Sequence, residues 1–236
     1  MPTKPVVTIA QQLNIAQVAI TNSLADPEIK AAVAQFGYTT AKLNAGQTLY
    51  QAALAAVDAQ KLGRGDQKVA TAELKAKEKD ARDAYQALAK VARATLDQAT
   101  QVKLGALNKE PRSTAGFIQV AYTLFDNATT ISELSDFGYD AERLAAERAK
   151  VEAFDQANQA QEMAKGTAQQ ATQDQDAALA KLNDWVAQYL KIARVALRGK
   201  KQLLEKIGVV ARTSKTAAQK AGLKKAAATR AAKKTA

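Results

Sequence analysis

The sequence contains neither cysteine nor histidine. Without cysteine there is no disulfide, no thiolate nucleophile and no thiolate metal site. Without histidine the chain lacks the usual general base and the commonest metal ligand, so Ser-His and Cys-His nucleophile systems are excluded. A metal site would need oxygen ligands alone, and a catalytic base would have to be a carboxylate or a lysine. We therefore expect no enzyme, no cofactor and no metal.

Helix-breaking residues and large apolar side chains are also scarce. Four prolines and eleven glycines interrupt 236 residues, and aromatic residues make up 5% of the chain. The hydrophobic share of 47% includes 54 alanines. Alanine together with Glu, Lys, Leu and Arg forms about half of the chain, a composition typical of long helices or coiled coils. We predict an all-α protein, an antiparallel helical bundle with closely approaching, alanine-lined helices.

Long apolar runs and nucleotide-binding motifs are missing as well. No stretch approaches 18 uninterrupted apolar residues, and the N-terminal Met-Pro-Thr-Lys-Pro leads into no signal-like apolar core. Glycine motifs of the P-loop or dinucleotide-binding type do not occur, which argues against nucleotide sites of those kinds. The expectation is a cytoplasmic protein without integral membrane insertion.

What the sequence does have is an internal repeat. With a shift of 101 positions and no gap, residues 36–96 align with residues 137–197 at 18 identities in 61 positions. Upstream, Gln17-Val18-Ala19 matches Gln119-Val120-Ala121 once one residue is dropped. An internal repeat of this length is informative about the architecture of the chain. Each copy alone has a thin core, so the two copies are expected to share one folded body. We predict two tandem three-helix repeats that together form one bundle.

The repeats divide the chain into five segments. These are a flexible arm (1–7), the first helical repeat (8–107), a linker (108–112), the second helical repeat (113–208) and a basic Ala/Lys tail (209–236). Thr8 is expected to begin the first helix, and Asp26-Pro27-Glu28 to begin the next one with a cap, a first-turn proline and an early acidic residue.

The tripeptide Phe-Gly-Tyr occurs at residues 36–38 and again at residues 137–139, the same position in both repeats. A glycine just past a helix end often adopts the left-handed conformation. The residue after the glycine, here the tyrosine, then packs on the residue five positions before that tyrosine. Here these partners would be Val33 for the first tyrosine and Leu134 for the second. We interpret the tripeptides as helix–helix corners rather than ligand sites. The corner residues are Phe36, Gly37, Tyr38, Phe137, Gly138 and Tyr139.

The polar middle of each repeat leaves two architectures open. A continuous helix over residues 39–104 would be roughly 100 Å long at about 1.5 Å per residue. A hairpin that turns near residues 63–65 and 164–166 would instead lay Tyr50 against Leu88 and Phe154 against Tyr189. The hairpin gives each apolar stripe a partner, so it is the favoured alternative.

Two recurring residue groups invite a functional interpretation. Lys90 and Arg93 recur as Lys191 and Arg194. A paired anion cradle is one interpretation, but we favour basic residues whose stems flank an apolar seam and whose charged ends reach water. Trp185, one turn from a tyrosine, is interpreted as part of the core rather than a ligand box.

The tail carries most of the excess positive charge. The whole chain has a net charge of +11, and the residues after Ala211 include eight basic and no acidic ones. With one large apolar side chain after Val210, the tail cannot bury a core and is expected to be disordered alone. The eight basic residues are Arg212, Lys215, Lys220, Lys224, Lys225, Arg230, Lys233 and Lys234.

The alanine-lysine composition of the tail resembles the C-terminal tails of linker-histone-like bacterial proteins and of some granule-associated phasins. The resemblance covers about 25 residues and implies sequence-independent attraction to a polyanion such as DNA or RNA. Because no aromatic residue stands among the tail cations, base stacking is not expected.

Three functional hypotheses can be compared with the sequence. The first is a non-enzymatic structural or scaffolding protein that self-associates or binds a protein partner, and that the tail tethers to nucleic acid. The second is an amphipathic, phasin-like coat protein of a lipid or polymer granule. The third, an enzyme that depends on a carboxylate or lysine, has almost no support in the residues.

Overall fold

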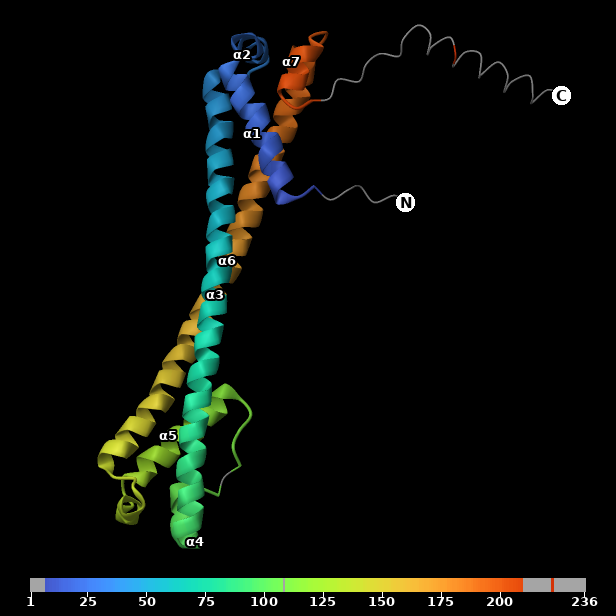
Figure 1. The fold of residues 1–236 in the computed structure, drawn as a ribbon. Helices are drawn as coiled ribbons and strands as arrows, with labels where there is room; N and C mark the ends of the chain where they lie inside the picture. The colour runs from blue at the N-terminus through green and yellow to red at the C-terminus, as the bar shows by residue number, and fades with distance from the viewer. Residues whose placement is uncertain (1–6, 108, 210–221, 223–236) are drawn as a thin grey trace, which may run out of the picture. The chain divides into compact units, whose positions relative to one another are not determined.

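The structure, a computed structural model, describes residues 7–107, 109–209 and 222. These residues are mostly helical and include no β-strand, which confirms the all-α class. The flexible arm up to residue 6 and almost all of the basic tail lie outside the described residues. In chain order the helices are α1 (Ile9–Ala25), α2 (Pro27–Ala34), α3 (Thr40–Thr95), α4 (Gln98–Leu104), α5 (Thr114–Ala128), the 3-10 helix η1 (Ser132–Phe137), α6 (Ala141–Ala196) and α7 (Lys201–Lys206) (Figure 1).

The first two helices begin where the sequence places their caps. Gln11 N donates to Thr8 Oγ1 at 3.2 Å, and Thr8 N donates to Gln11 Oε1 at 2.9 Å, which completes a capping box at the start of α1. Asp26 ends α1 and caps α2, whose first residue is Pro27. The missing N–H of proline costs nothing at this position, because the first amides of a helix have no partner inside the helix.

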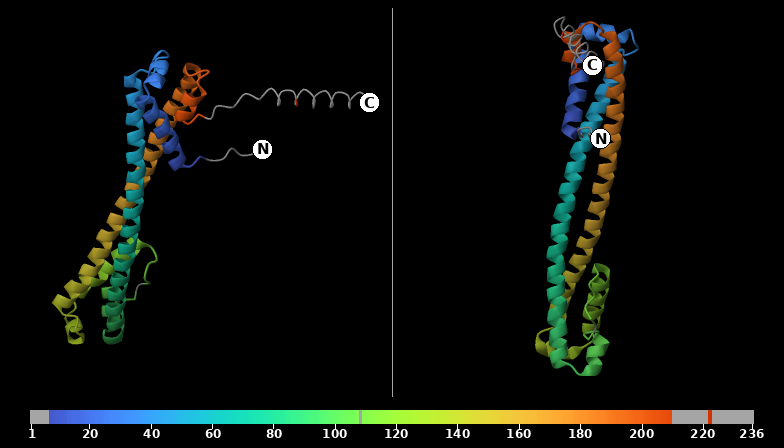
Figure 2. Two further views of the ribbon diagram at one scale, coloured as in Figure 1. Left: turned by 45° about the horizontal axis from the view of Figure 1, so that its top comes forward. Right: turned by 90° about the vertical axis from the view of Figure 1, so that its right-hand side faces the viewer.

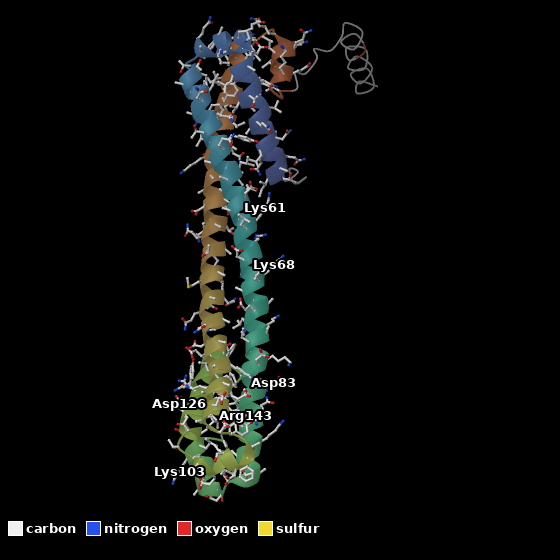
Figure 3. The ribbon with its side chains drawn as sticks, turned by 60° about the vertical axis from the view of Figure 1, so that its left-hand side comes forward. Lys61, Lys68, Asp83, Lys103, Asp126 and Arg143 are labelled. Atoms are coloured by element: carbon white, nitrogen blue, oxygen red, sulfur yellow. The ribbon has the colours of Figure 1, made fainter. Side chains whose placement is uncertain are left out.

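The favoured hairpins are wrong, because α3 and α6 are each continuous over 56 residues. The polar middle is rich in Ala, Lys, Glu and Gln, which are good helix formers, and it contains no proline. A glycine inside a helix costs about 1 kcal/mol, too little to end a helix in such surroundings. Figure 3 shows Lys61, Lys68 and Asp83 along α3, all exposed to solvent.

One of the glycines assigned to the turn has a packing role instead. Gly63 is buried within α3, and a Cβ at this position would lie 3.4 Å from the Cα atom of Ala168 in α6. The glycine therefore lets the two helix backbones approach closely. At Gly65 and Gly166 a Cβ would meet nothing within 4 Å, so these glycines have no such contact.

The chain divides into two compact units. Unit 1 comprises Met1–Leu54 and Ala178–Ala236, and unit 2 comprises Ala55–Ala177. Each unit contains the leading helices of one repeat, the start of that repeat's long helix, the end of the other long helix and the short helix after it. Each apolar stripe at the start of a long helix thus packs in the same unit as a stripe at the end of the other long helix.

In unit 1 the helices α1 and α2 lie beside the first part of α3 and the last part of α6 (Figure 1, Figure 2). The core is built around three aromatic rings. The rings of Tyr38 and Tyr189 have centroids 5.1 Å apart, and the Trp185 indole stacks on Tyr189 at 5.3 Å. Ser23 of α1 is hydrogen-bonded to the hydroxyl of Tyr189, and burial raises the pKa of that hydroxyl, which stays protonated.

In unit 2 the helix α5 lies beside the last part of α3 and the first part of α6 (Figure 2). Phe117 of α5 contacts Tyr85 of α3 at a centroid distance of 5.5 Å and Phe154 of α6 at 6.0 Å. Leu88 belongs to this core, together with Phe154, whereas Tyr189 belongs to the core of unit 1. The contact between Phe154 and Tyr189 expected from the hairpin is therefore not formed within either core.

Candidate functional site

The two Phe-Gly-Tyr corners have the same backbone geometry. In unit 1 Gly37 has φ 82°, and Tyr38 N donates to Val33 O at 3.1 Å. In unit 2 Gly138 has φ 81°, and Tyr139 N donates to Leu134 O at 3.0 Å. These bonds satisfy carbonyls at the helix end, as in a Schellman motif. Both corners thus redirect the chain into a long helix.

A cation lies over the tyrosine ring of each corner. Lys42 Nζ lies 4.2 Å from the ring centre of Tyr38, and Arg143 Cζ lies 4.3 Å from the ring centre of Tyr139. Each cation comes four residues after its tyrosine, on the first turn of the long helix. The cation–π contact therefore holds the corner against the helix that follows it.

The phenylalanines of the corners differ from the tyrosines in burial. Tyr38 and Tyr139 are buried, whereas Phe36 is 46% exposed and Phe137 is 48% exposed. Neither phenylalanine is part of a core cluster. Each Phe-Gly-Tyr corner therefore ends a helix and leaves its phenylalanine half exposed to solvent.

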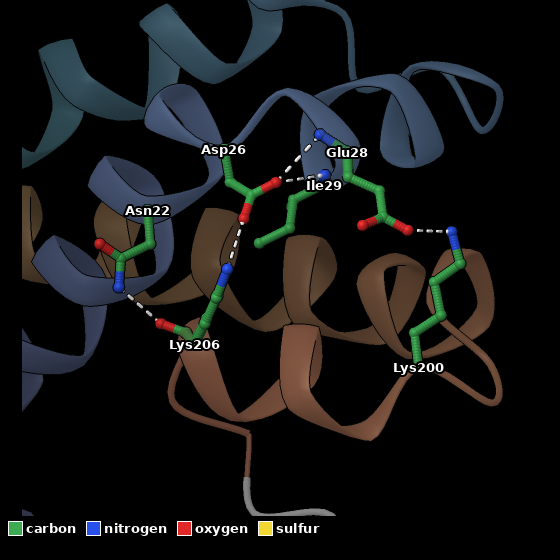
Figure 4. Close-up of polar contacts among 6 residues, drawn as sticks. All are labelled: Asn22, Asp26, Glu28, Ile29, Lys200 and Lys206. Atoms are coloured by element: carbon green, nitrogen blue, oxygen red, sulfur yellow. Dashed lines mark hydrogen bonds and ion pairs between the residues drawn. The ribbon is translucent and has the colours of Figure 1, made fainter.

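The short helix α7, after which the tail begins, is held to the start of α2 by polar contacts (Figure 4). Lys206 Nζ lies 2.9 Å from Asp26 Oδ2, and Lys200 Nζ lies 2.6 Å from Glu28 Oε1. Asn22 Nδ2 also donates to the backbone oxygen of Lys206 at 2.5 Å. We call these three contacts the α2–α7 clamp.

Asp26 is the central residue of the clamp. Its Oδ1 atom accepts the backbone N–H groups of Glu28 at 2.9 Å and of Ile29 at 3.2 Å, while Oδ2 faces Lys206. The ammonium group of Lys206, with the backbone N–H of Ile29, lowers the pKa of the Asp26 carboxyl below its usual range. One carboxylate thus caps α2 and anchors the last described helix.

The two units differ in charge. The described residues of unit 1 hold nine Lys and Arg against four Asp and Glu, whereas unit 2 holds sixteen against nineteen. The unit that continues into the basic tail is therefore itself basic, and the other unit is slightly acidic. The nine cations of unit 1 are Lys30, Lys42, Lys181, Lys191, Arg194, Arg198, Lys200, Lys201 and Lys206.

Six of these nine cations lie between residues 191 and 206. This segment of 16 residues comprises the end of α6, the turn that follows and α7. The clamp pairs two of the six with Asp26 and Glu28. The other four are exposed, and none forms an ion pair with a residue that the structure describes. We call this group the unit 1 basic face, and its residues are Lys191, Arg194, Arg198 and Lys201.

The corresponding pair in unit 2 is placed differently. Arg93 Nε donates to the backbone oxygen of Ala106 at 2.7 Å, which ties the segment after α4 to the end of α3. Lys90 is exposed. In unit 1, Arg194 makes no such bond among the described residues. Arg93 therefore stabilises the backbone of its own unit, whereas Arg194 is exposed on the surface of unit 1.

Two charged side chains pair with each other at an open cleft of the described residues. An open cleft of about 420 Å³ lies in unit 2 beside η1 and α6, and its charged residues include Asp126 and Arg148. These two pair with each other, with Arg148 Nε donating to Asp126 Oδ1 at 2.7 Å. Across the described part of the chain, no group of three or more Asp or Glu is placed to hold a metal ion. The same residues include no helix long and apolar enough to cross a membrane.

The structure does not place the eight basic tail residues, because all of them lie outside the described residues. Comparison with known proteins adds no analogy: no family model matches the chain, and no curated protein or solved structure shows significant similarity to it. The function must therefore be argued from the residues themselves.

Proposed function

We propose that this protein is a non-enzymatic helical scaffold that its basic tail tethers to nucleic acid without sequence specificity. In this proposal the two tandem three-helix repeats supply the folded body, which self-associates or binds a protein partner. Residues 209–236 supply the tether.

The charge of unit 1 is the observation that carries the proposal. If the tail cations served only for solubility, nothing would require further cations in the folded unit that precedes them. Instead, the described residues of unit 1 have a net charge of +5, and those of unit 2 have a net charge of −3. Positive charge is therefore concentrated in the unit whose sequence continues into the basic tail, and such a concentration of charge attracts a polyanion.

Counterion release supplies the binding free energy. Each phosphate that a lysine or arginine neutralises releases condensed cations from the duplex, and the logarithm of affinity falls with the logarithm of salt concentration by about 0.9 per contact. Eight tail contacts would give a slope of about −7. Such contacts position a protein on the duplex without reading its bases.

The test is DNA binding by the full chain and by a chain that lacks residues 211–236. We expect the full chain to bind duplexes of unrelated sequence equally well, with a steep salt dependence. A full-length variant with the eight tail cations changed to glutamine separates the effect of charge from that of chain length. If the glutamine variant binds as tightly and with the same salt slope as the natural chain, the tail is not the tether.

A coat protein of a lipid or polymer granule is the second candidate. Leu62 and Val69 are exposed and stand seven residues apart on the same side of α3, and Met163 of α6 is exposed as well. These apolar groups could contact an apolar surface. Co-sedimentation with neutral liposomes or polymer particles, with helicity retained, would favour this function, and no enrichment on either would exclude it.

A further inference from the structure

The unit 1 basic face has no structural task in the described part of the molecule. Buried or paired basic side chains usually stabilise a fold, but Lys191, Arg194, Arg198 and Lys201 are exposed and unpaired with any described residue. Exposed cations this close together in sequence repel one another at low salt. Their concentration in one short segment therefore needs a reason other than folding.

The internal repeat provides a direct comparison. In unit 2 the segment that follows α3 is also a short helix that ends at a left-handed glycine, Gly105, as α7 ends before Gly208. The backbone bonds agree too, because Ala106 N donates to Gln101 O and Val209 N donates to Leu204 O. The two short helices thus end in the same way.

The two short segments differ in charge. Between residues 96 and 107 of unit 2 there is one basic residue, Lys103, and one acidic residue, Asp97. Between residues 197 and 208 of unit 1 there are four basic residues and one acidic residue, Glu205. Because unit 2 forms a short helix with the same stop and with fewer cations, folding does not require Arg198 or Lys201. Lys191 and Arg194, by contrast, have counterparts in Lys90 and Arg93 of unit 2, and Arg93 is bonded to the backbone of its own chain.

The four cations of the basic face follow one another along the end of α6, the turn after it and the start of α7. Lys191 and Arg194 are one turn apart on α6, with a rise of about 4.5 Å between them. Arg198 follows in the turn after the end of α6. Gly199, with φ 87°, then turns the chain into α7, whose first residue is Lys201. Since duplex DNA carries one charge for about every 1.7 Å of its axis, cations at this spacing have phosphates within reach.

The α2–α7 clamp fixes this path to the body of unit 1. Asp26 and Glu28 hold Lys206 and Lys200 on either side of Lys201. They also neutralise two of the six cations, so the charge that stays available is that of the basic face alone. The face is therefore held on folded structure, unlike a contact made through a linker.

We propose that Lys191, Arg194, Arg198 and Lys201 form a phosphate-binding surface on folded unit 1 that binds the nucleic-acid backbone together with the tail. This inference rests on the proposed function, and it adds a second, structured anchor to the tether. Two linked anchors raise the effective concentration of each for the same polyanion. The folded anchor also limits the orientations in which the scaffold meets the duplex.

The experiment measures DNA binding by four full-length proteins. These are the natural chain, a face variant (K191Q, R194Q, R198Q, K201Q), a tail variant with its eight cations changed to glutamine, and the combined variant. Fluorescence anisotropy with a labelled 20-base-pair duplex gives the affinity between 50 and 200 mM salt. We expect the face variant to have a salt slope shallower by up to about 3.6, since each lost contact removes about 0.9. The tail variant should keep a weak, salt-sensitive affinity that the combined variant loses.

The matched control removes four exposed cations from unit 2 instead. Lys68, Lys75, Lys90 and Lys103 are exposed and form no ion pair with a described residue, so their change to glutamine alters the net charge by the same amount. This control should bind DNA within about twofold of the natural chain. If the face variant and the control variant bind equally well, the proposed surface is wrong. Circular dichroism verifies that each variant is folded, and the double variant K191Q, R194Q repeats the test with fewer changes.

The outcomes separate this inference from the proposed function. If the tail variant loses binding while the face variant does not, the tether holds and the surface is wrong. If the face variant loses binding while the tail variant does not, the surface holds and the tail is not the tether. If all four proteins bind DNA alike but differ on vesicles that contain phosphatidylserine, the face binds a lipid surface and the nucleic-acid proposal is overturned.

Discussion

The indole of Trp185 covers Gly46 in the core of unit 1. A Cβ added to Gly46 would lie 2.4 Å from Cζ2 and Cη2 of the indole, far inside contact distance. At the corresponding positions of the repeat, unit 2 has Glu147 and Ala84. A glycine thus faces the large indole in unit 1, whereas the repeat has a larger residue in place of the glycine and a small one in place of the tryptophan.

This contact predicts a destabilising Gly46→Ala substitution, although alanine is the better helix former. The gain in helix propensity is about 1 kcal/mol, whereas overpacking of a well-packed core costs about 1–3 kcal/mol. We expect a net loss of stability and a shift in the fluorescence of Trp185, the only tryptophan of the chain. The control is Gly65→Ala, where a Cβ meets nothing within 4 Å and stability should rise. Equal effects of the two substitutions on urea unfolding would show that the indole does not restrict Gly46.

A second prediction concerns the two buried tyrosines whose hydroxyl groups have different surroundings. The Tyr189 hydroxyl is bonded to Ser23, which itself donates to Ala19 O at 2.6 Å. The Tyr85 hydroxyl is buried without a hydrogen-bond partner among the described residues. Tyr189→Phe should therefore cost about 1 kcal/mol, the net value of one intramolecular hydrogen bond.

Tyr85→Phe is the matched substitution, and it should be neutral or stabilising because it removes a buried polar group that has no partner. Chemical denaturation of both variants gives the comparison. A loss at Tyr85 as large as the loss at Tyr189 would mean that the Tyr85 hydroxyl has a partner after all.

The sequence predicts the class of this fold and the starts of its first helices better than its tertiary pairing. Alanine-rich composition and few breakers indicate helices, and local caps such as Thr8 and Asp26-Pro27 act within four residues of their partners. The hairpin prediction is wrong because it gives each apolar stripe a partner within its own repeat, whereas the stripes pack on the other long helix. It also places Gly63 in a turn. A glycine in a helix can mark a turn or a close contact, and only the helix across from it, here at Ala168, decides which.

The composition of the units could not be predicted for a related reason. Periodicity shows which face of each helix is apolar, but it does not show which stripe pairs with which. The same limit applies to the clamp, because Asp26 and Lys206 are 180 positions apart and neither has a local signal for the other. A signal did exist at Asp97, whose side chain caps α4 through Thr100 N, and it could have placed the end of α3.

A third prediction follows from the left-handed glycines of the corners. Gly37 has φ 82°, and a Cβ there meets nothing within 4 Å, so the cost of Gly37→Ala comes from backbone conformation alone. That cost is roughly 1–2 kcal/mol for an L-residue. Gly166→Ala, equally open but helical, should instead stabilise the protein by up to about 1 kcal/mol. Thermal unfolding measures both, and the same sign for the two variants would contradict the corner geometry.

The last prediction concerns acid sensitivity at the clamp. The pKa of Asp26 is lowered in the folded protein, first by Lys206 and then by the backbone N–H of Ile29. A lowered pKa contributes stability that is present above the unfolded value, about 3.9, and is lost as the pH falls through the folded value. Unit 1 should therefore lose stability as the pH falls below about 4, and Trp185 fluorescence during unfolding reports it.

Asp26→Asn tests this dependence, because asparagine still caps a helix but cannot titrate or pair with Lys206. The variant should be less stable than the natural chain at pH 7 and should lose less stability on acidification, so that the difference between the two becomes smaller at low pH. Asp97 serves as the control, since its pKa is also lowered, by Thr100, but it lies in unit 2. Asp97→Asn should leave the acid response of Trp185 unchanged. A parallel loss of stability in natural and Asp26→Asn chains would show that another carboxylate controls unit 1.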